Sequence, residues 1–455
     1  MHPHIFRKYD IRGIVGDDLD ASITESVGQA FASYVRSETG AINPTIAVGA
    51  DNRDSSPALA AGLIAGVRKA GVNVLDTGTV PTPVLYWTEA TNNVEAGVEI
   101  TGSHNPPEWN GIKMSVKRGS LYGDAIQNLR ARIEENDLDS GAGDYEEVEI
   151  IDDYIRDVSR RFDLSRPMKV AVDCGNGTAS LVAERLMHAL GVSVTPLFCK
   201  SDPTFPNHHP DPTVDENLQD LITTVENSGH DFGVAFDGDG DRLGVVDERG
   251  SIIRGDLLLL LYGLDLLSKK GAGHKLIFDV KCSQVVGEVF AKAGGQPIMW
   301  KTGHSLIKKK MRETGALLGG ELSGHIMIAD DYFGFDDALY SACRLISIVS
   351  ASGSTLSEMT ADFPAYVSTP EIRIDVTEEQ KWHIVEEAVA HFGTLHEVIT
   401  VDGARIQFAG GWALLRASNT QPIIVARFEA RTQERLSEIR EEIDLWLQAR
   451  GLSAR

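Results

Sequence analysis

Residues 46–56 read IAVGADNRDSS, and this stretch indicates the class of fold. An apolar run, Ile46–Asp51, ends in an aspartate, continues through a short polar loop and reaches two serines. The pattern returns as VAVDCGNGTAS at 170–180 and as LIFDVKCSQ at 276–284. A buried strand that runs into a polar loop, followed by a helix that opens near Ser or Thr, is typical of a β–α unit. We therefore expect α/β domains with mixed or mostly parallel sheets.

The three copies predict three related α/β domains, and the C-terminal part differs from them. We expect domains at 1–148, 149–251 and 252–364, followed by a smaller α+β domain at 365–455. The elements predicted for this last domain are strands at Glu371–Val376, Arg405–Phe408, Trp412–Arg416 and Ile423–Glu429, with helices at Glu378–Ala390 and Glu434–Gln448.

Composition excludes several classes of protein. The 455 residues are 42% hydrophobic and 24% charged, as in ordinary globular proteins. The net charge of −23 argues against nucleic acid or an anionic membrane as the main partner. Four cysteines without CxxC spacing favour buried thiols over a zinc site or disulfides. With no apolar core of signal-peptide length near the N-terminus, we expect a cytoplasmic protein.

Residues 101–111 read TGSHNPPEWNG and contain a candidate nucleophile, Ser103. The strand-like run Val94–Ile100 leads into the loop, and apolar residues resume at Ile112. Prolines with fixed dihedrals and glycines with free ones can hold the serine in one pose. A well-capped surface turn is the alternative interpretation.

Residues 237–242 read DGDGDR and suggest a metal site. Asp237, Asp239 and Asp241 can surround one hard cation, because the glycines between them let the backbone curl. Magnesium is favoured because few protein oxygens are offered. The alternatives are a solvated acidic turn and an EF-hand, but the sixth position is Arg242 instead of glycine and strands flank the loop. The position of Arg242 suggests contact with a phosphoryl oxygen.

Residues 319–325 read GGELSGH and suggest recognition of hydroxyl groups. On an extended segment, Glu321, Ser323 and His325 would point to one side. With His304 of the KTGHS segment at 301–305, His325 is also a candidate proton shuttle. For either histidine, a structural role is the alternative.

Residues 416–422 read RASNTQP and suggest a phosphate-binding loop. A guanidinium and several small hydrogen-bond donors are concentrated there, although an ordinary turn would have a similar composition. The residues concerned are Arg416, Ser418, Asn419 and Thr420. A second basic group comprises Arg7, Lys8, Tyr9 and Arg12, with Lys113 after the serine loop.

Taken in order, these motifs resemble the α-D-phosphohexomutase superfamily, and most closely its bacterial phosphomannomutase/phosphoglucomutase branch. The resemblance runs from FRKYDIRG through TGSHNPPEWNGIK, DGDGDR, KTGHS, GGELSGH and FGFDD to RASNT. It implies four domains around a central cleft. It also implies that Ser103 carries a phosphoryl group and binds Mg²⁺ together with the three aspartates.

The same resemblance assigns the remaining site residues. Glu321, Ser323 and His325 would hold the sugar. The non-reacting phosphate would be held by Arg416, Ser418, Asn419 and Thr420, and Tyr9 and Lys281 would also contact the substrate. Because three aspartates leave the metal site about one charge negative, further cations must face the transferred group, and Arg12, Lys113 and Arg242 are the candidates. Lys113, His304 and His325 stay open as the acid or base, in that order.

The implied reaction interconverts mannose 1- and 6-phosphate, and glucose 1- and 6-phosphate, through a phosphoserine and a hexose 1,6-bisphosphate. One Mg²⁺ per chain, glucose 1,6-bisphosphate as activator, phosphohexose substrates and a monomer or small homo-oligomer are expected. A phosphoglucosamine mutase is an alternative, weakened by Leu322 where that branch usually has Gln. A magnesium-dependent sugar-phosphate phosphatase and a catalytically silent sugar-phosphate sensor are the others.

Overall fold

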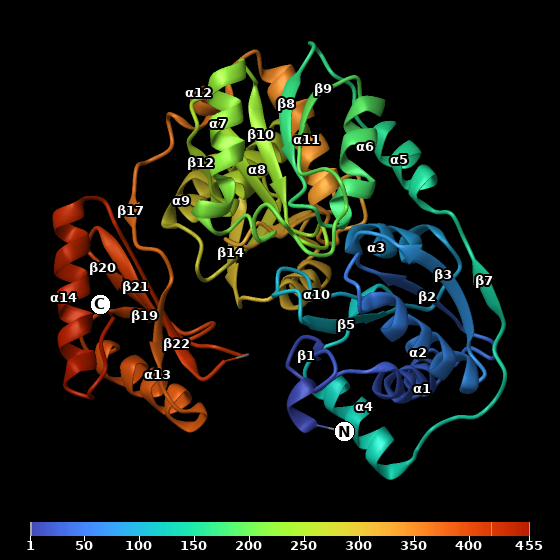
Figure 1. Ribbon diagram of the computed structural model, residues 1–455. Helices are drawn as coiled ribbons and strands as arrows, with labels where there is room; N and C mark the ends of the chain where they lie inside the picture. Colours follow the sequence, from blue (N-terminus) through green and yellow to red (C-terminus); the bar gives the residue numbers. More distant parts are fainter. Residues whose placement is uncertain (1, 420, 455) are drawn as a thin grey trace.

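Four β-sheets follow one another along the chain in the computed structural model, which describes residues 2–419 and 421–454. The sheets and their helices form an arc, with the first and the fourth at its two ends (Figure 1). The second and third share the top of the arc. This arrangement confirms the predicted fold class, whereas the domain boundaries at 148, 251 and 364 stay predictions.

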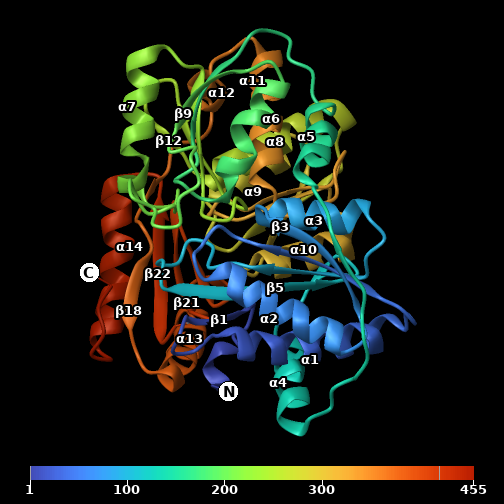
Figure 2. The same cartoon turned by 45° about the vertical axis from the view of Figure 1, so that its right-hand side comes forward.

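The first sheet has the strand order β1-β5-β4-β2-β3-β7, with β6 paired to β5. Helices α1 and α2 lie side by side below it, and α3 covers the opposite face (Figures 1 and 2). The strands are β1 (Ile11–Ile14), β2 (Thr45–Ala50), β3 (Asn73–Thr79), β4 (Ala96–Ile100), β5 (Trp109–Val116), β6 (Gly119–Ser120) and β7 (Tyr145–Glu147). The helices are η1 (Pro3–Ile5), α1 (Ala21–Thr39), α2 (Ser56–Lys69), α3 (Thr82–Thr91) and α4 (Asp124–Glu135).

The second sheet has the order β12-β11-β10-β8-β9. Its strands are β8 (Lys169–Asp173), β9 (Ser193–Leu197), β10 (Phe232–Phe236), β11 (Leu243–Asp247) and β12 (Ile252–Ile253). The helical segments around it are α5 (Ile151–Ser159), η2 (Thr178–Leu181), α6 (Ala183–Ala189), η3 (Asp215–Leu218) and α7 (Gln219–Ser228).

The third sheet has the order β14-β13-β15-β16. Its strands are β13 (Lys275–Asp279), β14 (Gln296–Trp300), β15 (Leu318–Gly320) and β16 (Ile326–Ile328). Its helices are α8 (Gly255–Lys270), α9 (Gln284–Lys292), α10 (His304–Thr314), α11 (Ala338–Ser352) and α12 (Leu356–Thr360).

The three sheets share one four-stranded arrangement. The orders β5-β4-β2-β3, β11-β10-β8-β9 and β16-β15-β13-β14 correspond strand for strand. In each, the first pair is antiparallel and the other two pairs are parallel. The predicted repeats are β2, β8 and β13, the third strand of each set. The antiparallel pair places a short connecting loop at the same position in all three domains.

The predicted helix starts are only partly capped by side chains. Ser283 accepts a hydrogen bond from the backbone of Val285 at the start of α9. Ser55 precedes α2 without such a bond and instead accepts one from Asn110 of β5. After β8 the chain enters the 3-10 turn η2 before α6 begins.

The fourth sheet is antiparallel, with the order β17-β22-β21-β20-β19 and β18 paired to β22. Its strands are β17 (Val367–Ser368), β18 (Ile372–Asp375), β19 (Glu397–Ile399), β20 (Ala404–Phe408), β21 (Gly411–Ala417) and β22 (Ile423–Ala430). Helices α13 (Glu378–Phe392) and α14 (Gln433–Gln448) complete it. None of the helices in residues 2–419 and 421–454 combines the length and hydropathy that crossing a membrane requires.

The third and fourth domains are joined by buried side chains. Trp412 of β21 is fully buried and packs with Val280, which follows β13. The Arg405 guanidinium lies 3.8 Å from the centre of the Trp412 ring and donates to the Val280 carbonyl. The Trp412 indole donates to Glu429 at 2.7 Å.

This packing predicts that Trp412→Ala lowers the free energy of unfolding by about 3–5 kcal/mol, because it empties a buried site and removes one of the two hydrogen bonds that Glu429 Oε1 accepts. Urea titration followed by circular dichroism measures the change. Trp382, which is 48% exposed, is the matched control, and Trp382→Ala should cost less than about 0.5 kcal/mol. Equal losses for the two tryptophans would contradict the assignment of Trp412 to the domain contact.

Candidate active site

A cleft of about 1200 Å³ lies between the domains and is lined by residues from all four. Most of the predicted site residues line it, namely Tyr9, Arg12, Ser103, Lys113, Arg242, Lys281, His304, Glu321, Ser323, His325, Arg416, Ser418 and Asn419. Asp237, Asp239 and Asp241 lie directly beneath its wall and are fully buried. Thr420 lies outside the described residues.

The equivalent loops of the three α/β domains all reach this cleft. The loop between β4 and β5 carries Ser103, and the loop between β10 and β11 carries the three aspartates. The loop between β15 and β16 carries Glu321 and His325. The repeated fold therefore brings three loops together, although more than 200 residues separate Ser103 in the first from His325 in the third.

Ser103 is 3% exposed and has a backbone φ of 50°, in the left-handed region. Its Oγ lies 3.2 Å from Oδ2 of Asp237 and 3.0 Å from Nδ1 of His104. Burial, reinforced by Arg242 and Arg12, holds the pKa of His104 well below its usual value. The neutral imidazole can accept the serine hydrogen bond. We had not singled out His104, although its place next to Ser103 was a signal.

The three aspartates have the donor set of a cation site. Their ligand oxygens lie within 4.8 Å of one another. In each carboxylate one oxygen accepts hydrogen bonds from the protein. Oδ1 of Asp237 accepts from backbone N–H groups. Oδ2 of Asp239 accepts from Thr82 and Lys113, and Oδ2 of Asp241 accepts from Lys113.

The other oxygens remain available. Oδ1 of Asp239 and Oδ1 of Asp241 are buried without a hydrogen-bond partner among the described residues. Oδ2 of Asp237 faces Ser103. Burial, with repulsion from Asp241 and Asp239, raises the pKa of Asp237 well above its usual value. One oxygen per carboxylate, beside a serine, suits a hard cation that prefers oxygen ligands.

Lys113 crosses from the first domain to the aspartates. Its Nζ lies 2.6 Å from both Asp239 and Asp241. Burial alone would lower the pKa of Lys113, but the two carboxylates outweigh it and hold that pKa well above the usual value. Lys113 is therefore a cation in this arrangement, which favours the histidines as proton acceptors.

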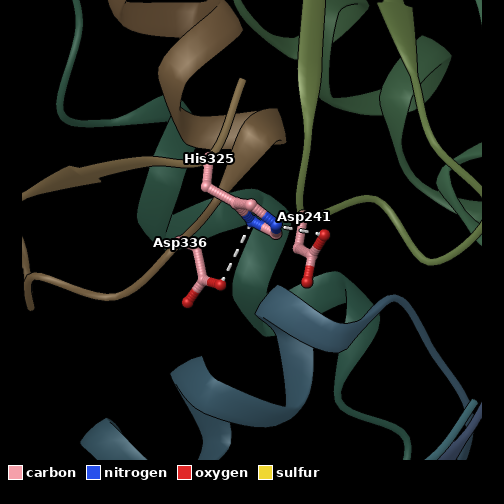
Figure 3. A group of neighbouring side chains, drawn as sticks. All are labelled: Asp241, His325 and Asp336. Atoms are coloured by element: carbon pink, nitrogen blue, oxygen red, sulfur yellow. Dashed lines mark ion pairs between the residues drawn. The ribbon is translucent and has the colours of Figure 1, made fainter. Parts of the chain in front are cut away.

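Two histidines stack at the cleft wall, with ring centres 5.2 Å apart. His325 receives the Nε–H of Arg242 on its Nε2 at 3.1 Å. Its Nδ1 lies between Asp241 at 3.5 Å and Asp336 at 3.4 Å (Figure 3). Both ring nitrogens of His325 thus face protein groups.

His304 is oriented by Asp336, whose Oδ2 lies 2.6 Å from His304 Nδ1. The other oxygen of Asp336 accepts from Lys308 at 2.7 Å. Asp241, His325 and Asp336 also have the proximity of a metal site. However, Asp336 already uses both oxygens, for His304 and Lys308, so we interpret this second group as charge contacts of His325 with two carboxylates. Neither Asp336 nor Lys308 was predicted as a site residue.

The prediction that residues 319–325 are extended is wrong. Residues 321–325 form a tight turn between β15 and β16, with the Glu321 N–H bonded to the His325 carbonyl. Antiparallel strands need such a reversal, and Gly324 with a φ of 91° permits it. Glu321 and His325 nevertheless line the cleft together because they flank the turn. Glu321 accepts the Gly303 N–H at 2.7 Å and so links the turn to the KTGHS segment.

The predicted phosphate loop meets three other segments. Nε of Arg416 bonds Asp402 at 2.5 Å, and Asp402 also accepts the Thr302 N–H. Asn419 accepts from Lys8 and donates to the Tyr9 hydroxyl, both at 2.8 Å. The N-terminal basic group and the C-terminal loop are therefore neighbours across the cleft.

Two further observations concern this region. Lys281 pairs with Glu371 at 2.6 Å between the third and fourth domains. Arg427 lines the cleft although it was not predicted. A charged residue in the otherwise apolar run at 423–428 of a buried strand was the signal that could have identified it.

All four domains match family models of one class of multidomain protein. The models are described as phosphoglucomutase/phosphomannomutase, alpha/beta/alpha domains I, II and III and C-terminal domain, and they match residues 3–140, 152–250, 254–366 and 371–445. The chain therefore belongs to the phosphoglucomutase/phosphomannomutase family.

Individual relatives resemble the chain over nearly its full length. A phosphomannomutase/phosphoglucomutase of Pseudomonas aeruginosa is 49% identical over 440 residues, which cover 96% of this chain and 94% of the relative. A phosphoglucomutase of Neisseria meningitidis is 44% identical, covering 96% and 95%. A Burkholderia thailandensis structure of a phosphoglucomutase/phosphomannomutase family protein has a TM-score of 0.94 at 41% identity, covering 99% and 98%.

The environment of His304 predicts its titration. Burial lowers the pKa of His304, despite Asp336, so the neutral imidazole should predominate at pH 7 and the pKa should lie below about 6.5. The unfolded chain binds this proton at higher pH than the folded chain does. The neutral imidazole of His304 therefore stabilises the folded state fully above about pH 6.5, and this stabilisation is lost as the pH falls through the pKa of the folded state.

Imidazole NMR signals recorded against pH, with His304→Gln to assign the resonance, measure this pKa. A midpoint above 6.5 would contradict the description of the His304 site.

Proposed function

We propose that this protein is a phosphomannomutase/phosphoglucomutase that interconverts the 1- and 6-phosphates of mannose and glucose. The observation that carries the proposal is the 3.2 Å contact between Ser103 and Asp237 at the base of a cleft built by four domains. The names of the relatives at 44–49% identity support the same activity. A protein named "Probable phosphoglucosamine mutase" is a more distant relative, at 34% identity.

Phosphoryl transfer would proceed in two balanced steps. Phospho-Ser103 gives its phosphoryl group to the free hydroxyl of a hexose 1- or 6-phosphate, and the hydroxyl gives up its proton. The resulting hexose 1,6-bisphosphate turns over in the cleft. Its other phosphoryl group then returns to Ser103, and the proton returns to the sugar oxygen. Such transfer depends mainly on positioning and charge stabilisation.

Asp237, Asp239 and Asp241, with Ser103, would hold one Mg²⁺, which when bound neutralises charge on the phosphoryl oxygens. Three carboxylates around a divalent ion leave about one negative charge before the phosphate is counted. Lys113, already 2.6 Å from two of the carboxylates, supplies one positive charge.

Arginines supply the remaining positive charge. Arg12 lies beside the serine loop, with Nη1 donating to Asn105 at 3.0 Å. Arg242 is the last residue of the aspartate loop and donates to His325 Nε2. Both line the cleft, where they would face the transferred group.

The sugar and the non-reacting phosphate would occupy the opposite wall. Glu321, Ser323 and His325 would bind hydroxyl groups from either orientation of the sugar. Arg416, Ser418, Asn419 and Thr420, aided by Tyr9 and Lys281, would bind whichever phosphate is not reacting. Asp402 neutralises Arg416 without substrate, so a bound phosphate would share that guanidinium with it.

His304 is the proton carrier that the geometry favours. Asp336 fixes its Nδ1 side, and among the described residues the one hydrogen-bond contact of Nε2 is with Ser305 at 3.5 Å. His325, enclosed by Arg242, Asp241 and Asp336, would act as hydrogen-bond donor or relay. A cytoplasmic monomer or small homo-oligomer that uses glucose 1,6-bisphosphate as activator completes the proposal.

Ser103→Ala should abolish mutase turnover because it removes the oxygen that carries the phosphoryl group. The assay incubates glucose 1-phosphate with the protein, Mg²⁺ and glucose 1,6-bisphosphate and quantifies glucose 6-phosphate and free phosphate separately. Intact mass should show one phosphate on the wild type, mapped to residues 101–111, and none on the variant. Ser437→Ala, on the exposed face of α14, is the matched control.

Free phosphate without glucose 6-phosphate would instead identify a phosphatase. Binding of the sugar phosphate without any turnover would identify a sensor. Undiminished turnover in Ser103→Ala would remove the serine from the mechanism.

A further inference from the structure

Arg53, three residues after β2, is buried with 2% exposure and bonds the serine loop through four backbone carbonyls. Its guanidinium donates to the carbonyls of Ser103 at 2.9 Å, Asn105 at 2.7 Å, Pro106 at 2.6 Å and Trp109 at 3.1 Å. Arginine presents its donors in a rigid planar fork, so four simultaneous contacts define the shape of a loop closely.

Asp51 completes this arrangement. Its Oδ2 accepts from Arg53 Nε at 3.1 Å and from the Gly102 N–H at 2.9 Å. Its Oδ1 accepts from the Arg53 N–H and from the hydroxyl of Ser56. A buried ion pair is costly unless hydrogen bonds satisfy both partners, and here most of those bonds end on the serine loop.

The backbone of Ser103 needs such support. A residue with a Cβ seldom adopts a φ near 50°, and such conformations persist where surrounding contacts hold them. The Ser103 N–H donates to Thr101 Oγ1 at 2.8 Å, while the Ser103 carbonyl accepts from Arg53. These two bonds hold the peptide groups on either side of Cα and so direct Oγ toward Asp237.

The same guanidinium explains why residue 102 must be glycine. A Cβ at this position would lie 2.4 Å from Cζ and from Nε of Arg53. Its backbone φ is not in the left-handed region, so glycine is required here for space. The loop and the arginine are therefore packed against each other without a gap.

The other two α/β domains have an aspartate at the position of Asp51 but no arginine at the position of Arg53, so they lack the clamp formed by its four bonds to backbone carbonyls. Asp279 accepts the Leu322 N–H of the turn at 321–325 at 3.3 Å, and Asp173 accepts the Gly175 N–H at 2.8 Å. Two residues after these aspartates stand Lys281 and Gly175, in place of Arg53. The four-carbonyl clamp thus belongs to the one loop that carries the nucleophile.

We propose that Arg53 and Asp51 are positioning residues that hold Ser103 in its left-handed backbone conformation for phosphoryl transfer. The inference rests on the proposed mutase function. Neither side chain lines the cleft, so both act through the loop and leave sugar binding to the opposite wall.

The test compares Arg53→Lys, Asp51→Asn and Gly102→Ala with the wild type in the mutase assay at saturating glucose 1,6-bisphosphate. Lysine keeps the charge but loses the fork, asparagine keeps the shape of Asp51, and alanine displaces the guanidinium from the opposite side. In each variant kcat should fall at least about 20-fold while KM changes less than about twofold, because the nucleophile is misplaced and the sugar site is not. Arg185→Lys, in an exposed ion pair with Asp152, should retain the wild-type values.

Amide hydrogen exchange supplies a readout that does not require activity. The peptide covering residues 101–111 should exchange at least about tenfold faster in Arg53→Lys, with the peptides of β2 and β5 outside the loop unchanged. If the wild type had no mutase activity, the proposed function would fail, and this exchange would still test the clamp. Unchanged exchange in the loop, a uniform increase over the whole first domain, or a rise in KM at constant kcat would each overturn the inference.

Discussion

Lys113 reaches from the first domain into the second and lies 2.6 Å from two of three buried aspartates. Most of the site depends on this contact. Three buried carboxylates placed together repel one another, and burial penalises each charge. Lys113 offsets part of that repulsion, and it does so from the strand that follows the serine loop. The same ion pairs therefore hold the aspartate loop together and align it with Ser103.

Repetition of one topology explains how the remaining groups reach the cleft. In each α/β domain the loop that joins the antiparallel pair lies on the cleft side. The three loops contribute different groups: a serine hydroxyl, three carboxylates, and a turn with Glu321 and His325. The fourth domain has another topology and contributes guanidinium groups. The described contacts between Asn419 and the N-terminal residues Lys8 and Tyr9 close the ring of domains. The cleft is therefore lined by side chains from all four domains.

Sequence patterns predicted the local elements well. Short apolar runs that end at polar loops identified β2, β8 and β13, and the strands β20, β21 and β22 agree with expectation within one or two residues. The sequence also identified the segments of the candidate site, because their motifs combine glycine with charged residues at strand ends. The functional roles assigned to those residues stay predictions.

Contacts between distant segments could not be predicted. The sequence around Arg53 does not show whether its side chain is solvated or buried. The pairing of β4 with β5 folds the serine loop so that four of its carbonyls surround the guanidinium. The i, i+2, i+4 spacing of Glu321, Ser323 and His325 fits a strand as well as a turn, so the wrong conformation was chosen. The hydrogen bonds of Asp336 with His304 and Lys308 likewise depend on how α10 packs against the loop at 329–337.

The central claim is that a nucleophilic serine and a cation share one cluster of three carboxylates. Anomalous diffraction from crystals grown with Mn²⁺ as the probe tests this most directly. We expect one strong peak coordinated by Asp237, Asp239 and Asp241, with Ser103 Oγ or its phosphate as a further ligand. A peak at Asp241, His325 and Asp336, or a peak remote from Ser103, would contradict the account.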